Sequence, residues 1–334
     1  MVVMLIGVVL IGTTITNDLF KVGPAFEDLT DDFRPVLTAQ ALDTARADVE
    51  GLRAAGEEFQ TAVAPAMAAQ LGMTPGEFQA FVSEQYPGVA DGMAALPQIV
   101  PTFNGLIDTL DAQREVFASA DAIPTSSLPA TTVPWALLIA GIVVLSIGVV
   151  MWFVPRVGGI IAIAAGAMLV VAPLVLSLPA KASDADQMNA NLRPVYTQEL
   201  IDGSNGALAT VGTMGTEMSG TMLPALAEQL GMSGDELQVF LGENFPATAA
   251  ALETLPASME RFQGLLGTFE TNLGNYRTME PVSFAPIIWT VIVGGAVTFV
   301  MGLWALAATR RRAPSIQTTP YTAPTPAPVG AGQR

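Results

Sequence analysis

The sequence predicts an all-α integral membrane protein with four transmembrane helices and two helical extracytoplasmic bundles that arise from an internal tandem duplication. Hydrophobic residues make up 51% of the 334 residues, more than in an ordinary soluble protein. They are concentrated in four runs without Asp, Glu, Lys or Arg, and the sequence between the runs repeats itself after 159 residues. The predicted segments are transmembrane helix 1–16, extracytoplasmic domain 17–133, transmembrane helix 134–154, cytoplasmic turn 155–159, transmembrane helix 157–177, extracytoplasmic domain 178–285, transmembrane helix 286–309 and a disordered Pro-rich cytoplasmic tail 310–334.

The lengths of the apolar runs decide which of them can cross a membrane. Residues 134–154, 157–177 and 286–309 reach the roughly 20 residues that a helix needs to cross about 30 Å of hydrocarbon. Residues 1–16 are shorter, but they lack the basic start and the Ala-x-Ala-like cleavage site of a signal peptide. We therefore expect a fourth membrane helix here, with a natural start a few residues upstream.

The distribution of charge predicts the orientation. Residues 17–133 contain 17 acidic and 5 basic residues, and residues 178–285 contain 13 acidic and 4 basic residues. The other basic residues are Arg156, between the second and third runs, the triplet Arg310–Arg312 and Arg334. Because basic loops stay in the cytoplasm, we predict a multi-pass protein of the plasma (inner) membrane with cytoplasmic N- and C-termini and two extracytoplasmic segments.

A repeated stretch reveals the duplication. The sequence "QLGMTPGEFQAF" at residues 70–81 corresponds to "QLGMSGDELQVF" at residues 229–240. The same offset aligns about 26 identities in roughly 84 ungapped positions, and it places Gly7 on Gly166. Each copy crosses the membrane twice, so both copies have the same orientation, and the expected pseudo-two-fold axis runs along the membrane normal.

Each outer segment has the pattern of consecutive helices. Apolar residues at three-and-four spacing predict one long helix over residues 35–71, on the order of 55 Å long and bent at Pro65. Gly72 is a typical helix stop, and Thr74 with Glu77 forms a capping box that begins the next helix. The second copy repeats this pattern at Gly231, Ser233 and Glu236.

The short helix that follows is expected to end near Pro87, and a last helix is expected beyond Pro97. Its apolar residues include Phe103 and Phe117, and it runs back toward the membrane. Each outer segment is thus predicted to be a separate antiparallel bundle that stands on its own two membrane helices.

The residue types present argue against catalysis. The chain has no His and no Cys, which excludes disulfides, Ser-His or Cys-His nucleophiles and metal sites built from imidazole or thiolate. The acidic cluster Glu27, Asp28, Asp31 and Asp32 could hold calcium, but it lacks EF-hand spacing, and the second copy keeps only Asp186. We predict no enzymatic activity, no metal and no cofactor.

Three sets of residues are candidates for a functional role. Small residues on membrane helices pack the two copies together or dock a partner membrane protein, and this set is Gly141, Gly148, Gly295 and Gly302. Aromatic and apolar residues of the outer helices form the core or an apolar groove, and this set is Phe78, Phe81, Phe103, Leu237, Phe240 and Phe262. Polar residues kept in both copies form solvated faces or ion pairs, and this set is Arg34, Asp43, Glu84, Arg193, Asp202 and Glu243.

These observations favour a structural role over transport or catalysis. The membrane helices lack ionisable groups, which disfavours a pump or an ion channel. The absence of Asn-x-Ser/Thr sequons and the excess of Arg over Lys favour a bacterial source. We predict a non-enzymatic envelope membrane protein whose acidic ectodomains bind or organise another envelope component, with the lipid bilayer and another envelope protein or lipid as partners and no nucleic acid. The alternative is an accessory subunit of a transport or sensing system that holds an apolar ligand between the ectodomain helices.

Overall fold

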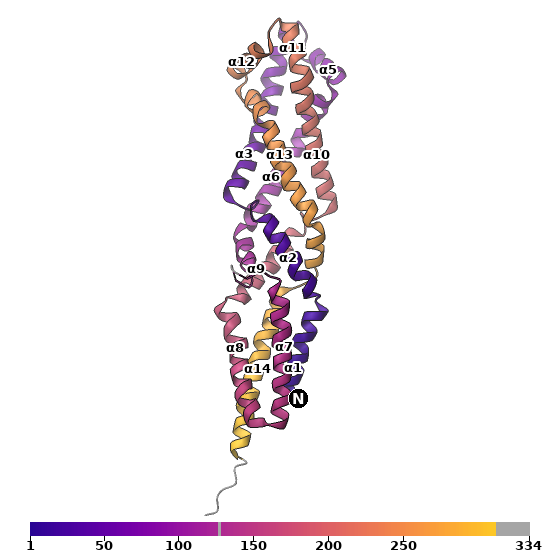
Figure 1. Cartoon of the computed structure of the whole chain (residues 1–334). Coiled ribbons are helices and arrows are strands. Elements are labelled where there is room, and N and C mark those ends of the chain that lie inside the picture. The colour runs from indigo at the N-terminus through magenta and orange to yellow at the C-terminus, as the bar shows by residue number, and fades with distance from the viewer. Residues whose placement is uncertain (126–127, 312–334) are drawn as a thin grey trace, which may run out of the picture.

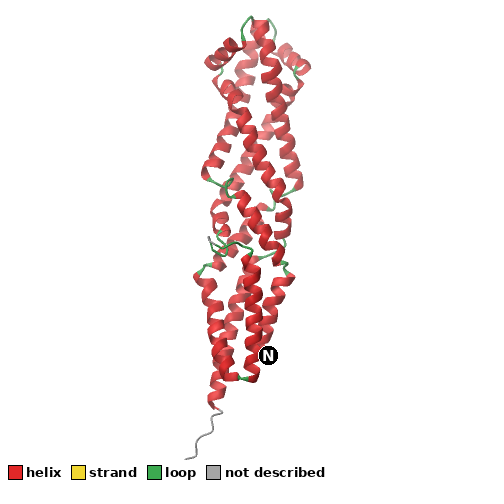
Figure 2. Ribbon diagram, in the orientation of Figure 1, coloured by secondary structure: helices red, strands yellow, loops and turns green. Residues whose placement is uncertain are grey.

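The computed structural model describes residues 1–125 and 128–311, with the side chains of residues 310 and 311 left out. All the regular elements in these residues are helices. They form an elongated molecule with a bundle of apolar helices at one end and a longer helical stalk at the other (Figure 1). Short loops join the helices at the waist and the ends of the molecule (Figure 2). Of the predicted tail 310–334, residues 312–334 lie outside the described residues.

The helices form two series, one in each half of the chain. The first half contains α1 (Val2–Thr16), α2 (Leu19–Phe33), α3 (Ala39–Glu58), the π-helical turn η1 (Phe59–Val63), α4 (Ala64–Gln70), α5 (Pro75–Gln85), α6 (Pro87–Asp121) and α7 (Thr132–Phe153). The second half contains α8 (Pro155–Val175), α9 (Leu178–Leu192), α10 (Gln198–Glu217), the π-helical turn η2 (Met218–Met222), α11 (Leu223–Leu230), α12 (Gly234–Asn244), α13 (Pro246–Met279) and α14 (Phe284–Arg311). We call α1, α7, α8 and α14 the membrane bundle and the other helices the stalk.

The two series match closely. The bounds of α2, α3, η1 and α5 become those of α9, α10, η2 and α12 when 159 is added to each number. Gly72 and Gly231 both have φ of 69°, the left-handed conformation that favours glycine after a helix. Both predicted capping boxes are confirmed, with Thr74 and Ser233 as the capping residues.

The long helix and its proline differ in detail from the sequence prediction. The helix begins at Ala39 rather than at residue 35, because the Thr38 side chain accepts a hydrogen bond from Ala41 and caps it. Pro65 cannot donate a backbone hydrogen bond, and its ring crowds the preceding turn. The turn before it is widened to a π-helix, in which the Ala64 N–H bonds to the Phe59 carbonyl.

Two other predicted boundaries are wrong. Helix α6 begins at Pro87 and continues through Pro97, whereas a new helix was predicted only beyond Pro97. Proline fits the first position of a helix, where its missing N–H has no partner to lose. The same reason explains the start of α8 at Pro155, so the predicted cytoplasmic turn 155–159 is helical and the chain reverses at Val154.

The membrane bundle contains three to four helices that can span a membrane. Helices α7 and α8 and the segment that contains α14 are long and apolar enough to do so. Helix α1 is shorter, and it meets this criterion only together with α2, from which it is bent by 54°. Helix α1 lies against α7, and α8 lies against α14. The length and composition of these helices indicate association with a membrane.

Exposed tryptophans mark two levels of the membrane bundle. Trp135 and Trp289 lie near the stalk ends of α7 and α14, and Trp152 and Trp304 lie near their opposite ends. All four are more than half exposed. The two levels are roughly 25 Å apart at 1.5 Å per residue, close to the thickness of the hydrocarbon core. Tryptophan is enriched at both membrane surfaces, so this spacing supports the membrane assignment.

The stalk is one bundle rather than two. Helix α6 of the first half packs on α9 and α10 of the second half, and α13 packs on α2 and α3 (Figure 1). Helices α3, α6, α10 and α13 thus surround a common core. The prediction of two separate bundles is therefore wrong, because an apolar stripe fixes which face of a helix is buried but not which helix covers it.

Two glutamates also join helices of different halves. The Glu58 carboxylate, at the end of α3, accepts a hydrogen bond of 2.6 Å from the Thr248 N–H in the first turn of α13. Glu217, at the end of α10, accepts one of 2.8 Å from the Val89 N–H in the first turn of α6. The first turn of a helix has N–H groups without helical partners and attracts negative charge. Each glutamate therefore caps a helix of the other half.

Replacing Glu58 or Glu217 by alanine is expected to lower the free energy of unfolding by about 1–2 kcal/mol, the usual cost of losing an N-terminal cap. Thermal unfolding of the purified protein in detergent measures this change. Glu57→Ala is the control, because Glu57 is exposed and pairs only with Arg53 on its own helix. Equal destabilisation by Glu57→Ala and Glu58→Ala would contradict the capping role.

Candidate functional site

The glycines of the predicted docking face are in contact with other helices of the membrane bundle. Gly141 lies against Gly7 of α1, where an added Cβ would come within 3.1 Å of the Gly7 carbonyl oxygen. Gly295 lies against Gly166 of α8 in the same way, at 3.0 Å from its carbonyl oxygen. Gly148 and Gly302 likewise contact α1 and α8. The four glycines therefore pack the two membrane helices of each half together, and this face is not open to a partner.

The residues predicted to form an apolar groove lie in separate parts of the stalk. Phe103 and Phe262 meet across the stalk axis, with ring centroids 4.9 Å apart in an edge-to-face arrangement. Phe78 and Phe81 lie near the tip with Tyr86, and Phe240 lies against Phe245 at the equivalent place of the second half. Leu237 and Phe78 are buried beneath the tip helices. These residues belong to the core and do not line one continuous groove.

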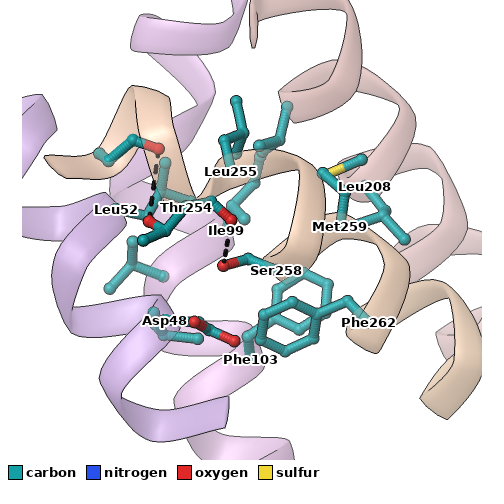
Figure 3. Close-up of a pocket in the computed structure, with 14 residues that line it drawn as sticks. Asp48, Leu52, Ile99, Phe103, Leu208, Thr254, Leu255, Ser258, Met259 and Phe262 are labelled. Atoms are coloured by element: carbon teal, nitrogen blue, oxygen red, sulfur yellow. Dashed lines mark hydrogen bonds between the residues drawn. The ribbon is translucent and has the colours of Figure 1, made fainter. Parts of the chain in front are cut away.

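The pair of phenylalanines borders a small cavity on the stalk axis (Figure 3). The cavity has a volume of about 40 Å³, and Leu52, Ile99 and Leu255 line it together with Phe103 and Phe262. A neighbouring cavity of about 40 Å³ lies beside the π-helical turns. A single water occupies about 10–15 Å³ by this measure. Each cavity therefore has room for a few water-sized atoms.

One carboxylate at the axial cavity is deeply buried. The side chain of Asp48 is 9% exposed, and both of its oxygens accept hydrogen bonds from Arg261 of the other half, at 2.7 and 2.8 Å. This bidentate pair raises the pKa of the Arg261 guanidinium, because the hydrogen bonds to Asp48 favour its charged form. The pair joins α3 to α13 and leaves both Asp48 oxygens occupied, which fits a structural role.

The polar residues kept in both halves form ion pairs or lie in solvent. Arg34 donates to Asp121 at 2.8 and 3.1 Å, and Arg193 donates to Glu280 at 2.8 Å, so the two pairs are equivalent. Asp43 lies 3.5 Å from Arg46, and Asp202 accepts a hydrogen bond from Gln198. Glu84 and Glu243 are exposed on the short tip helices.

Buried tyrosines occupy the waist of the second half. The rings of Tyr196 and Tyr276 are stacked with centroids 4.5 Å apart. Burial raises the pKa of both hydroxyls, that of Tyr276 to about 12. Tyr276 donates to the Asn189 carbonyl at 2.9 Å. Both hydroxyls are therefore neutral at physiological pH and do not act as acid–base groups there.

The described residues contain no group of three His, Cys, Asp or Glu side chains placed so that they could hold a metal ion. The acidic cluster that includes Glu27 and Asp31 is instead divided between an ion pair and a helix contact. Asp31 lies 2.9 Å from Arg34, and Glu27 accepts a hydrogen bond from the Thr131 N–H at 3.3 Å.

An open groove runs between α10 and α13. Its volume is about 760 Å³, and one side is formed by a row of small residues at three-and-four spacing, Ala209, Thr213 and Thr216 of α10 and Gly220 of η2. All four are exposed. Glu217 is the only charged residue among those that line the groove, and its carboxylate is bound to the Val89 N–H.

The equivalent face of the first half is charged. Arg46, Glu50, Arg53 and Glu57 of α3 stand where α10 has Asn205, Ala209, Gly212 and Thr216. The Arg53 guanidinium bonds to Glu50 and Glu57, and Arg46 reaches Asp108 and Asp111 of α6. The hydrogen bond from Arg53 lowers the pKa of Glu50. Ion pairs cover this face of α3, whereas the four equivalent residues of α10 are uncharged.

The sequence analysis did not identify this groove as a candidate site. The available signal was the loss of four charged residues between the aligned copies, on one helix face. An alignment of the two halves with attention to differences, rather than to identities, would have found it.

Comparisons with known proteins provide no further guide, because no protein-family model, curated protein or solved structure matches this chain. The groove and the membrane bundle are therefore the features from which a function can be inferred.

Replacing Gly7 by valine is expected to destabilise the protein by about 1–3 kcal/mol, the usual cost of overpacking. An added Cβ at Gly7 would lie 2.5 Å from the Leu145 backbone nitrogen, so α1 and α7 must separate. Gly12→Val on the same helix is the matched control, because nothing lies within 4 Å of its Cβ position. Thermal unfolding in detergent measures both variants, and an equal loss of stability would refute the close helix contact.

Proposed function

We propose that the protein is a non-enzymatic membrane protein of a bacterial envelope whose stalk binds or organises another envelope component through the groove between α10 and α13. In this proposal the membrane bundle spans the plasma membrane four times, both termini are cytoplasmic, and the stalk is extracytoplasmic. The two halves arose by tandem duplication. The proposal rests on the groove, because the uncharged helix face that forms it is found on α10 and not on the equivalent helix α3.

The charge pattern supports this orientation. Arg156 lies in the first turn of α8, and Arg310 and Arg311 end α14. These two helix ends lie at the end of the membrane bundle away from the stalk (Figure 1). The stalk segments are strongly acidic. Positive residues remain preferentially in the cytoplasm, so the stalk is on the opposite side.

The matching helix bounds support the duplication. The halves share the left-handed glycines, the capping boxes, the π-helical turns and the Glu58 and Glu217 caps, all at an offset of 159 residues. These four stabilising features of the stalk are thus the same in both halves. Only α3 of the first half carries ion-paired residues on this helix face. The fold does not require that α10 lacks them.

The bare face of α10 favours a helical segment of another envelope protein as the bound component. Small residues at three-and-four spacing let a second helix approach closely and pack along the groove. The remainder of the stalk is acidic, and the net charge of the chain is −16. A partner of any net charge meets the least repulsion and the least desolvation of charged groups on this face.

The alternative function, an apolar ligand held between the stalk helices, is not favoured by the size of the axial cavities. Each of the two has about 40 Å³, which is far below the 300–1,000 Å³ of ordinary ligand pockets. Phe103 and Phe262, which were candidates to contact such a ligand, are packed against each other.

Photo-crosslinking from the groove tests the proposal. A photoreactive residue placed at Thr213 of the full-length protein in native membranes is expected to capture one defined envelope protein. The matched control position is Ala54, the equivalent residue of α3, which stands among the ion-paired residues of the first half. Equal capture from Ala54 and Thr213 would count against a groove-specific partner.

A charge graft provides the second arm of the test. The variant Asn205→Arg, Ala209→Glu, Gly212→Arg and Thr216→Glu gives α10 the charged residues of α3. Asn205, Ala209 and Thr216 are exposed, and at the half-buried Gly212 an added Cβ would lie 3.0 Å from the flexible end of the Met259 side chain, so we expect the variant to fold. We expect it to lower recovery of the crosslinked partner at least roughly tenfold, or about 1.4 kcal/mol. Undiminished recovery by a variant of normal thermal stability would refute the proposed function.

A further inference from the structure

Two cavities meet where the stalk joins the membrane bundle. The first is apolar, has a volume of about 60 Å³ and lies among α2, α7, α9 and α14. The second is polar, has a volume of about 220 Å³ and lies between α2 and the connection from α6 to α7. Phe26, Ile123 and Ala130 line both cavities. The two cavities are therefore adjacent parts of one site, which we call the junction site, with an apolar and a charged end.

The charged end is acidic. Glu27, Asp31 and Asp121 line it together with Arg34, the one basic residue among its lining residues. Arg34 is held by Asp121 at 2.8 Å and by Asp31 at 2.9 Å. Three carboxylates against one guanidinium leave two negative charges in excess, so this end favours a cationic group. Arg34 bonds to these carboxylates through Nε and Nη2, and its Nη1 is the donor that can face an anion.

The apolar end lies at the level of the membrane surface. Its lining side chains Leu19, Val22 and Phe26 are at most 4% exposed. Phe20 and Trp135 beside it are exposed and in edge-to-face contact, with ring centroids 5.1 Å apart. Aromatic residues of this kind lie at the depth of lipid headgroups. The charged end therefore faces the headgroup region, and the apolar end faces the acyl chains.

The junction site is built from parts of the two halves that are not equivalent to each other. Residues 123, 125 and 128–130 of the connection between α6 and α7 line it, whereas the equivalent connection 280–283 is shorter. Lys181 of α9 holds the longer connection by donating to the Ala122 carbonyl at 2.8 Å and to the Pro124 carbonyl at 3.4 Å. The residue equivalent to Lys181 is Val22, which lines the apolar cavity. Each half therefore contributes a different part to a single site.

We propose that the junction site binds one phospholipid with an ethanolamine headgroup. The ammonium group lies among Glu27, Asp31 and Asp121, the phosphate lies toward Arg34, and the first part of one acyl chain enters the apolar cavity. A phospholipid of this class carries an ammonium group, a phosphate and apolar chains in that order. The site presents carboxylates, Arg34 and the apolar cavity in the same order. The apolar cavity accommodates only a few methylene groups, so the remainder of the chain lies along the membrane bundle in the bilayer.

Native mass spectrometry of the full-length protein tests this proposal. The protein is stripped of lipid in detergent and titrated separately with dioleoyl phosphatidylethanolamine and with the anionic dioleoyl phosphatidylglycerol. We expect one tightly retained phosphatidylethanolamine and weaker, non-saturating binding of phosphatidylglycerol. Equal retention of the two lipids would overturn the assignment of the headgroup.

Variants locate the lipid on the protein. The double substitution Glu27→Gln and Asp31→Asn is expected to weaken binding of phosphatidylethanolamine roughly tenfold, because two charge-assisted contacts are lost. Glu280→Gln is the matched control, since Glu280 is the equivalent of Asp121 in the second half and lines neither cavity. Unchanged binding in the double variant would overturn the proposal.

A second variant tests the apolar end separately. Gly23 lines the apolar cavity, and a Cβ added there would lie 3.4 Å from the Ala130 carbonyl oxygen. Gly23→Leu therefore fills the cavity and is expected to abolish retention of phosphatidylethanolamine. Retention by a folded Gly23→Leu protein would contradict the acyl-chain position. If this variant does not fold, the Glu27→Gln and Asp31→Asn variant decides the question, because those side chains are partly exposed. The charge graft on α10 leaves this site unchanged, so the outcome is independent of the groove.

Discussion

The exchange of helices between the two halves is the constraint on which the remainder of the stalk depends. Helix α6 is covered by α9 and α10, and α13 is covered by α2 and α3, so neither half has a complete core of its own. The Glu58 and Glu217 carboxylates join the end of one half's helix to the start of the other's, and the Asp48–Arg261 pair joins them again near the axis. The membrane helices, in contrast, pair within each half through close glycine contacts. The chain is thus divided into halves in the membrane bundle and interlocked in the stalk.

This division explains which features could be predicted from the sequence. The capping boxes and the glycine stops depend on residues that are near one another in the chain, and both were predicted correctly. The pairing of helices could not be predicted, because the apolar stripe of α3 can be covered by α6 or by its counterpart α13. The two halves carry nearly the same stripes, so periodicity does not distinguish a partner in the same half from one in the other half. The same reason applies to the predicted glycine face. Close helix packing was one of its two predicted roles, but the sequence did not show that α1 pairs with α7 and α8 with α14, each within one half.

Candidate sites were harder to predict than helices for a related reason. Residues kept in both halves attract attention in a duplicated sequence, yet in this structure they serve the fold: Arg34 and Arg193 form equivalent ion pairs, and the retained phenylalanines fill the core. Identity between the halves marks positions that the common architecture needs. Divergence marks positions that it does not need, and these are free to differ according to what they contact.

The places where the halves diverge are therefore the places where a function specific to one surface can exist. A symmetric partner could engage both halves equally and would keep both faces alike, whereas the groove on α10 and the junction site each occur on one side of the pseudo-two-fold axis. A single copy of a partner helix along the stalk and a single lipid at its base would remove any advantage of symmetry at those positions. The interlocked core makes this divergence tolerable, because the exposed residues of the α10 face differ from those of α3 while the Glu217 cap, which lines the groove, is kept. A rigid, symmetric framework can thus present asymmetric surfaces without a change of fold.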